Sequence, residues 1–332
     1  MIRKSELLMY DHSNMLKSLE AWPVYSKRAL SVPIDLPDFP KLMNIVILGM
    51  GTPNAVGRIL EYWSCVPLIA IDDWILPPWV GEETLVLALS YSGNTGEVLK
   101  TTEQSFERGG NIISISSGGK LQELGSKKRF TTITFESVGR SANSFPYLFL
   151  LSGRILNSLG LLDFHIDSEN LLEALKAIRA RQDWVDIGKL LNRSKQLVVC
   201  GGQNTAGLIT WIKHCLNETA KKLVIPLVLP EANHGEVEAF TELNSNDGVI
   251  FLRESSNETE WTTKSFEVYK EMLTNQGSSI IELKAEDTFR VTNTLSLAFQ
   301  GILISFWLAL FRKIDPTPLP IIDMLKKKLT KA

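Results

Sequence analysis

A turn rich in hydroxyl side chains follows a short apolar segment near residue 90. Residues 85–89 predict a buried strand, and residues 95–108 have the spacing of an amphipathic helix. At such a junction the first helical N–H groups lack partners and the helix dipole is positive, so a dianionic phosphate is stabilised there. An ordinary N-cap turn uses the same residue types. The residues expected to bind phosphate, through hydroxyls, amides and close backbone approach, are Ser90, Ser92, Gly93, Asn94 and Thr95.

Spacing alone identifies one further titratable candidate. His234 follows a predicted strand end and the turn-prone segment 230–233, a place typical of site residues in α/β folds. Histidine also titrates near neutral pH. On spacing alone, Glu218 and Lys326 are solvated surface side chains, because both lie near other lysines. The other histidines, which have no comparable setting, are His12, His165 and His214.

The first half of the chain alternates apolar runs with helical segments. Runs with little polar alternation, joined by helices, are typical of a parallel sheet covered on both faces. An opening helical segment at residues 4–30 is interrupted at Trp22-Pro23. Strands are predicted at 44–48, 67–71, 84–89, 111–115 and 130–135, with helices at 55–63 and 95–108.

A second alternating block begins near residue 196, after a segment at 161–194 that predicts a linker with one or two helices. Residues 200–207 can be laid over residues 48–57 with a small gap, which indicates an internal duplication. The expected fold is therefore α/β, with two doubly wound parallel-sheet subdomains flanked by helices. Strands are predicted at 196–199, 223–229, 248–252 and 279–283, with helices at 205–221, 258–275, 290–311 and from 320 onward.

Length and charge fit two ordinary globular subdomains. A chain of 332 residues is too long for a comfortable single core. We expect the N-terminal helix and the phosphate loop in residues 1–160, and the linker helices, second sheet and C-terminal helix in residues 161–332. The net charge of −2 and the brief basic runs provide no stripe for nucleic acid.

Cysteine usage and hydropathy predict a cytoplasmic protein. The three cysteines show no Cys-x-x-Cys pairing, so neither a disulfide scaffold nor a metal site is expected. The mixed charge of the first residues argues against secretion. The longest apolar stretch, residues 295–311, is slightly short for a bilayer span and is expected to be a buried core helix, so no membrane partner is predicted.

Six short motifs follow one another along the chain: Asp11 with Met15-Leu16 and Trp22-Pro23, Gly49-Met50-Gly51, Ser90 to Thr95, Leu216 to Lys221, Leu229 to His234, and Ile322 to Lys326. Together they resemble, in the same order, the motifs of bifunctional phosphoglucose/phosphomannose isomerases, which are built from sugar isomerase (SIS) domains. The resemblance covers most of the chain. It implies SIS-type subdomains and an aldose-ketose isomerase that interconverts glucose 6-phosphate and fructose 6-phosphate through a cis-enediol or enediolate, with no cofactor.

The same resemblance implies roles for individual side chains. Glu218 would be the base that moves a proton between C1 and C2, and Arg140 would stabilise the enediolate charge. His234 and Lys326 would share the opening of the sugar ring, with His234 reaching the site of the neighbouring subunit in a homodimer. The phosphate site would also include Gly51 and Thr52.

Two positions depart from the family pattern. Gly51-Thr52-Pro53 stands where the family carries Gly-Gly-Ser, and Pro53 has no N–H to donate, so Thr52 would have to replace the missing donor. Leu319 replaces a threonine of dual-specificity members, although Thr317 lies close by, which puts mannose 6-phosphate activity in question. These departures leave open an isomerase of another phosphosugar, or a sugar-phosphate-binding protein without catalysis.

A nucleotide-dependent oxidoreductase is a competing interpretation. Gly49-x-Gly51 follows a predicted strand, and Asp72-Asp73 comes about 20 residues later, as in dinucleotide-binding folds. Asn54 stands where the third glycine belongs, which disfavours this class. The presence of both Glu218 and His234 favours an enzyme over a binding-only sensor.

Overall fold

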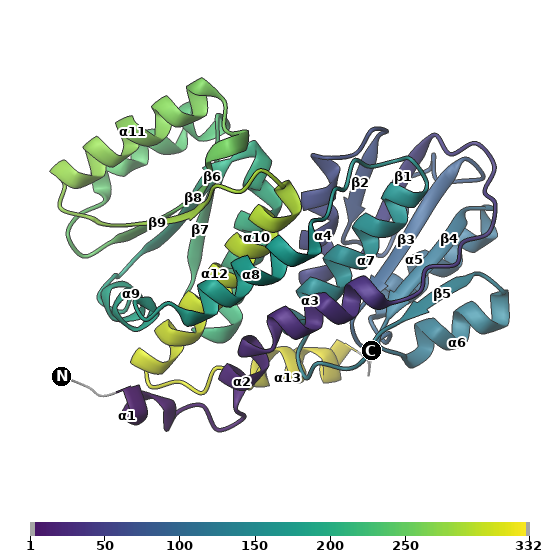
Figure 1. The fold of residues 1–332 in the computed structure, drawn as a ribbon, viewed down its shortest axis with the longest axis horizontal. Helices are drawn as coiled ribbons and strands as arrows, with labels where there is room; N and C mark the ends of the chain where they lie inside the picture. Colours follow the sequence, from purple (N-terminus) through teal and green to yellow (C-terminus); the bar gives the residue numbers. More distant parts are fainter. Residues whose placement is uncertain (1–3, 330–332) are drawn as a thin grey trace.

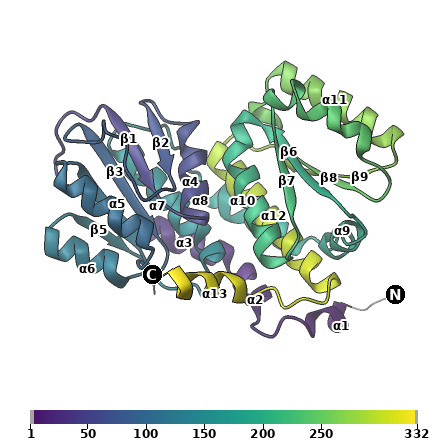
Figure 2. The same cartoon turned by 180° about the vertical axis from the view of Figure 1, so that it is seen from behind.

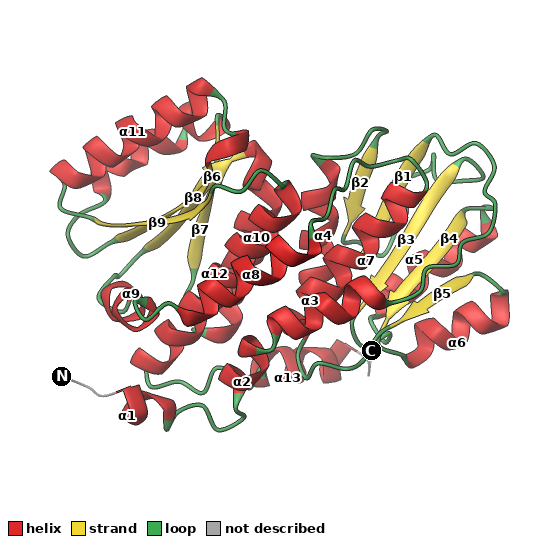
Figure 3. Cartoon of the chain, viewed as in Figure 1, coloured by secondary structure: helices red, strands yellow, loops and turns green. Residues whose placement is uncertain are grey.

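A computed structural model describes residues 4–329 and contains two parallel sheets set side by side, with helices between and around them (Figure 1). Figure 3 shows each sheet enclosed by helices, as expected for strands that are buried on both faces. The predicted α/β class with two doubly wound sheets is confirmed.

The first sheet consists of β1 (Asn44–Leu48), β2 (Leu68–Ile71), β3 (Thr84–Ser90), β4 (Asn111–Ser116) and β5 (Thr131–Thr134). Its strands are parallel and have the order β2-β1-β3-β4-β5. Every residue of β3 is buried. Long apolar runs of this kind are read correctly from sequence, and each strand begins and ends within one residue of its predicted range.

The second sheet consists of β6 (Leu197–Gly202), β7 (Val224–Leu229), β8 (Gly248–Glu254) and β9 (Ser279–Ala285). Its order, β7-β6-β8-β9, repeats that of the first four strands of the other sheet, β2-β1-β3-β4. This shared topology supports the internal duplication. Strands β6, β8 and β9 extend two or three residues past their predicted ends.

The largest core lies between the two sheets. Successive strand residues point to opposite faces, so Ile45 and Leu85 belong to this shared core, whereas Val46 and Val86 belong to a smaller core on the outer face of the first sheet. The helices of the shared core include α4 (Thr52–Glu61), α7 (Phe145–Ser158), α10 (Ala206–Thr219) and α12 (Arg290–Phe311). The outer faces are covered by α5 (Gly96–Glu107) and α6 (Gly119–Lys128) on the first sheet and by α11 (Glu260–Asn275) on the second.

The long apolar helix α12 is a core helix, as predicted. Within residues 4–329 it is the one helix long and apolar enough to cross a membrane, and 94% of its most apolar window is buried. Gly301 allows close packing, because a Cβ there would lie 2.5 Å from the Ile212 side chain on α10. The burial of α12 in the core accounts for its apolar composition.

The N-terminal segment is divided more finely than predicted. It forms α1 (Lys4–Leu8), α2 (Met15–Glu20) and α3 (Trp22–Ser31). The Asp11 carboxylate accepts hydrogen bonds from the backbone N–H groups of Met15 and Leu16, at 2.7 and 3.0 Å, and so starts α2. The remaining helices are α8 (Ser168–Ala180), α9 (Trp184–Leu191) and α13 (Pro320–Leu329), with 3-10 turns η1 (Ser141–Ser144), η2 (Gln203–Thr205), η3 (Glu231–Asn233), η4 (Glu236–Glu242) and η5 (Ser255–Asn257).

Candidate active site

A cavity of about 330 Å³ opens at the carboxyl ends of β1 and β3. The strand order reverses between these strands, since β2 lies beyond β1 and β4 lies beyond β3. Ligands of open α/β sheets bind at such a reversal. The rest of the lining comes mainly from α10 and α13. Figures 1 and 2 show α13 reaching from the end of α12 toward the loops of the first sheet.

Glycine determines the shape of the predicted phosphate loop, Ser90 to Thr95. Gly93 has φ +64°, and a Cβ there would lie 1.7 Å from the backbone oxygen of Gly118. No other residue fits this position. Gly119 makes a second close approach, because a Cβ on it would lie 2.4 Å from the backbone oxygen of Ser92. The loop therefore packs directly against the turn that precedes α6.

Some polar side chains of the loop bond within the loop, some line the cavity, and Thr95 does both. The buried Ser90 hydroxyl lies 2.9 Å from that of Thr95, and the Asn94 amide donates to the backbone oxygen of Ser92 over 2.9 Å. These contacts hold the loop in shape. Of the predicted phosphate residues, Gly51, Thr52, Ser92 and Thr95 line the cavity, whereas Ser90, Gly93 and Asn94 support the loop without lining it.

Two helices begin at the cavity without a side-chain cap. Gly51, before α4, has no side chain that could cap the helix. Within residues 4–329, the side chain of Thr95, before α5, accepts no hydrogen bond from its helix. The first N–H groups of both helices are left for water or a ligand, and both dipoles place partial positive charge at the cavity. Pro53 lies in the first turn of α4, where its missing N–H removes one of these donors. The arrangement favours a dianion.

Glu218 adds a carboxylate to the same cavity from α10. Its side chain is 33% exposed, and its Oε2 lies 3.7 Å from Nη2 of Arg140. Burial raises the pKa of Glu218, while the charges of Arg140, Lys221 and Lys326 lower it. A raised pKa makes the ionised carboxylate a stronger base. The site is therefore equipped for proton abstraction.

Arg140 lies behind Glu218 and is not among the residues that line the cavity. Its Nη1 donates to the backbone oxygen of Pro316 over 2.6 Å, which ties it to the segment before α13. Its Nη2 is buried and has no hydrogen-bond partner in the described part of the chain. Burial lowers the pKa of Arg140, but a guanidinium remains charged at neutral pH. A cation so placed stabilises negative charge beside Glu218.

The C-terminal helix brings Lys326 to the cavity. Lys326 is exposed to solvent, lies on α13 and contributes to the cavity lining. Lys221, just after α10, holds the segment before α13 in place. Its Nζ donates to the backbone oxygen of Glu218 and, over 2.7 Å, to that of Pro318. One lysine therefore couples the end of α10 to the start of α13.

Leu319 and Thr317 differ in their relation to the cavity. Leu319 lines it, whereas Thr317 does not. The Thr317 hydroxyl oxygen is buried and has no hydrogen-bond partner among the residues described. Thr317 therefore does not supply the hydroxyl that Leu319 lacks.

His234 lies away from this cavity. It is exposed, directly follows η3 after β7, and does not share the cavity with Glu218. One copy of the chain therefore does not bring His234 and Glu218 together. Its action in a neighbouring subunit stays a prediction.

Known proteins resemble the chain in sequence over both halves. Residues 187–329 match the family described as the bacterial phospho-glucose isomerase C-terminal SIS domain. A bifunctional phosphoglucose/phosphomannose isomerase of Caldicellulosiruptor bescii is 28% identical over 90% of this chain and 92% of its own length. The whole chain is similar to these isomerases, and its C-terminal part, residues 187–329, is a domain of this SIS family. A D-glucosamine-6-phosphate 4-epimerase of Sulfolobus acidocaldarius is 26% identical over 68% of the chain and 73% of its own length.

Solved structures that resemble the chain show the same fold. The C-terminal domain of glucosamine-fructose-6-phosphate aminotransferase from Francisella tularensis superposes with a TM-score of 0.65. The match covers 92% of this chain and 97% of that domain at 18% sequence identity. Such a likeness supports the two-sheet architecture and leaves the chemistry to the site residues.

Sequence reasoning overlooked several residues that line the cavity, among them the titratable His214. It lies one helical turn before Glu218 on α10, and both residues line the cavity. The signal was available, because residues four apart on a helix share a face. A prediction that puts Glu218 in a site also puts His214 beside it.

Proposed function

We propose that this SIS isomerase interconverts glucose 6-phosphate and fructose 6-phosphate. The observation that carries the proposal is one cavity lined both by the phosphate loop and by the Glu218 carboxylate. A hexose 6-phosphate has a matching pair of features, an anionic phosphate at C6 and a carbonyl with an adjacent acidic C–H at C1 and C2. The loop would anchor the phosphate so that the same C–H meets the carboxylate in each turnover.

We assign the proton transfer to Glu218. In the open-chain aldose its carboxylate removes the proton on C2, and the electrons of that C–H bond form the C1–C2 double bond while the carbonyl oxygen gains negative charge. Return of the proton to C1, with transfer of the O2 proton to the negatively charged O1, gives the ketose. Arg140 is placed next to Glu218 to stabilise the enediolate charge. Atoms and electrons balance without a cofactor.

We assign ring opening to Lys326 and to His234 of the partner subunit. Lys326 lines the cavity, whereas His234 of the same chain is exposed and outside it. A homodimer that carries each His234 into the other subunit's cavity supplies the missing group. Such an enzyme of sugar phosphate metabolism would work in the cytoplasm.

Isomerisation of another phosphosugar is the second candidate function. Leu319 lines the cavity where dual-specificity members carry threonine, so one polar contact to the sugar is replaced by an apolar one. The related epimerase shows that a relative of this chain acts on a different hexose phosphate. Mannose 6-phosphate activity is therefore a question for a substrate panel.

A coupled assay of purified protein tests the proposal. We expect conversion of fructose 6-phosphate to glucose 6-phosphate, and a loss of about 10²–10⁴-fold in kcat for Glu218→Gln, because the amide cannot act as a base. The affinity for sorbitol 6-phosphate, an open-chain analogue that cannot react, should be retained. A wild-type rate in the Gln variant would remove Glu218 from its role.

The control is Glu271→Gln, which changes an exposed glutamate on α11 and should leave the rate unaltered. If the wild-type protein does not convert fructose 6-phosphate but isomerises another sugar phosphate of a test panel, the second candidate function replaces the first.

A further inference from the structure

The imidazole of His214 stands in the cavity with its two nitrogens in different environments. Nδ1 is buried and has no hydrogen-bond partner within the described residues. Nε2 is not among the buried unpaired atoms, and no described group hydrogen-bonds to it, so it is the ring nitrogen that remains open to the cavity. The protein therefore leaves one polar atom of His214 for something that enters the cavity.

The surroundings keep this imidazole uncharged. Burial lowers the pKa of His214, and so do the nearby cations Lys213 on α10 and Arg58 on α4, while Asp72 after β2 acts in the opposite direction. A neutral imidazole carries one proton, on one of its two nitrogens. Since Nδ1 has no acceptor in the described structure, the tautomer with the proton on Nε2 leaves fewer buried donors unpaired. His214 therefore presents an N–H donor to the cavity.

The position of His214 relative to Glu218 indicates which part of a ligand it meets. The two residues are four apart on α10, which places their Cβ atoms about 5–6 Å from each other on one helix face. A sugar whose C1 and C2 lie at Glu218 therefore has the oxygens of its reacting end within reach of His214. The phosphate, held by the loop after β3, is at the other end of the molecule.

We propose that His214 is a further substrate-contacting residue, which donates a hydrogen bond from Nε2 to an oxygen of the open-chain sugar beside the carbons on which Glu218 acts. This inference rests on the proposed function in one respect, because it takes a sugar phosphate as the ligand. The contact orients the sugar chain for Glu218. A neutral donor at this place also polarises a carbonyl without giving up a proton.

Binding measurements separate this contact from a structural role. The affinities of wild type, His214→Ala and His214→Gln are measured by calorimetry for sorbitol 6-phosphate and for inorganic phosphate. We expect His214→Ala to weaken sorbitol 6-phosphate binding about ten-fold, the size of one neutral hydrogen bond, and to leave phosphate binding unchanged. Glutamine retains an N–H donor and should recover part of the affinity. The control is His165→Ala, since His165 is an exposed histidine paired with Asp163 outside the cavity.

Each outcome decides one question. Equal losses for both ligands, or no loss for either, would overturn the contact. Thermal melting curves show whether His214→Ala folds. If it does not, His214→Gln is compared with wild type instead. We then expect a smaller loss of affinity for sorbitol 6-phosphate and none for inorganic phosphate. A wild type that binds sorbitol 6-phosphate but does not isomerise fructose 6-phosphate would refute the proposed reaction and leave the His214 contact testable. Failure of wild type to bind sorbitol 6-phosphate would overturn both.

Discussion

The two sheets end in loops of equal length that differ in chemistry. The chain runs from Ser90 to Thr95 between the last residue of β3 and the cap of α5, and from Glu254 to Thr259 between the last residue of β8 and the cap of α11. Both loops lie where the strand order of their sheet reverses. The first opens to the cavity described above, whereas the carboxylates of the second accept hydrogen bonds from residues of the same chain.

Glu254 is an internal anion in the second loop. Its side chain is buried, and its carboxylate accepts hydrogen bonds of 2.9 Å from the amides of Asn204 and Asn257. The corresponding position in the first loop is Ser90, which carries no charge. The second loop therefore already contains the negative group that the first loop leaves to a ligand.

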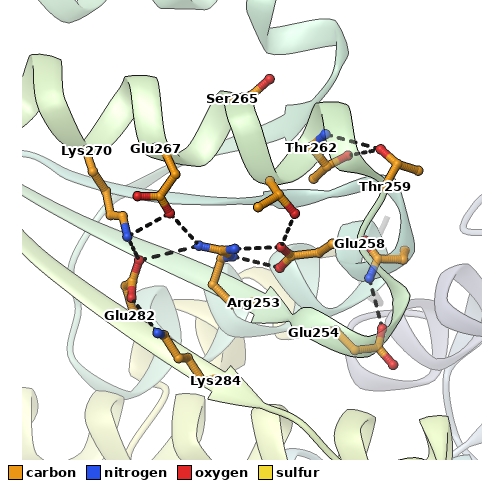
Figure 4. A network of polar contacts seen from close by, with 12 residues as sticks. Arg253, Glu254, Glu258, Thr259, Thr262, Ser265, Glu267, Lys270, Glu282 and Lys284 are labelled. Atoms are coloured by element: carbon orange, nitrogen blue, oxygen red, sulfur yellow. Dashed lines mark hydrogen bonds and ion pairs between the residues drawn. The ribbon is translucent and has the colours of Figure 1, made fainter.

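The rest of the second loop is also used internally. Glu258 binds the buried Arg253 through two hydrogen bonds of 2.7 Å (Figure 4). Thr259 caps α11 by accepting a hydrogen bond of 3.1 Å from the backbone N–H of Thr262. Thr95 makes no such bond to α5. We therefore expect the shared backbone to bind an anion only where the loop's own side chains leave the helix donors unpaired.

The largest effect expected from this comparison follows from adding a charge to either loop. Ser92→Asp should weaken sorbitol 6-phosphate binding roughly a thousand-fold, because two like charges about 4 Å apart repel by about 4 kcal/mol at an effective dielectric of about 20. Ser256→Asp, at the matching place in the second loop, should leave this affinity unchanged. Calorimetric titration of both variants makes the test. A similar loss in the two would mean that the second loop also contributes to ligand binding.

Two threonine variants should differ in their effect on ligand affinity. Thr95→Ala removes a hydroxyl that lines the cavity and pairs with the buried Ser90 hydroxyl, so we expect a loss of about 10- to 100-fold in sorbitol 6-phosphate affinity together with some loss of stability. Thr259→Ala removes the cap of α11 and should lower the free energy of unfolding by about 1 kcal/mol, with affinity retained. Titration and urea unfolding of both variants give the four values needed. The contrast is lost if Thr95→Ala retains the wild-type affinity or if Thr259→Ala loses it.

Glu254→Gln should have the smallest effect on catalysis. Its effect on the free energy of unfolding should depend on pH. Burial raises the pKa of Glu254 above its ordinary value of 4.5, so the native state binds this proton more tightly than the unfolded state does. Wild type therefore loses stability as pH rises from the ordinary carboxyl pKa through the raised one, and the Gln variant lacks this change. The amide also places an N–H₂ among asparagine donors, which should destabilise the variant by about 1–3 kcal/mol at acid pH.

Urea unfolding between about pH 4 and 8 measures this difference between Glu254→Gln and wild type. We expect the difference to narrow as pH rises, while kcat/KM for fructose 6-phosphate stays at the wild-type value. Glu271→Gln, on the exposed side of α11, provides the matched control and should show no pH-dependent difference. A constant difference for Glu254→Gln at every pH would contradict the raised pKa.

Local patterns predict the strands of this protein well and some of its helices poorly. Strand runs are short, apolar and bounded by turns, so their limits are visible in the sequence. Helix α7 is buried on nearly every side and lacks an amphipathic pattern, and α6 is short and polar, so neither is predicted. The sequence predicts one break in the opening segment, where the structure has two. The second break depends on the direction of the Asp11 side chain, whose carboxylate binds the first N–H groups of α2, and spacing does not show that direction.

The site shows the same limit of local reasoning. The phosphate loop is predicted from its own residues, because its strand, turn and helix are contiguous. The place of Glu218 depends on α10 packing against α4, which spacing in the sequence does not reveal, and it is the family resemblance that singles this residue out. Leu319 and Lys326 line the cavity next to a segment that Arg140 and Lys221 bind through long-range hydrogen bonds, which spacing in the sequence does not reveal either.

The dependence of the cavity on α13 has a consequence for protein synthesis. Both sheets are complete by residue 285, and the segment that closes the cavity follows 30 or more residues later. The core between the sheets needs α12, and the cavity needs the still later residues Leu319, Ile322 and Lys326. During synthesis the parts that fill the core therefore emerge before the parts that complete the cavity lining.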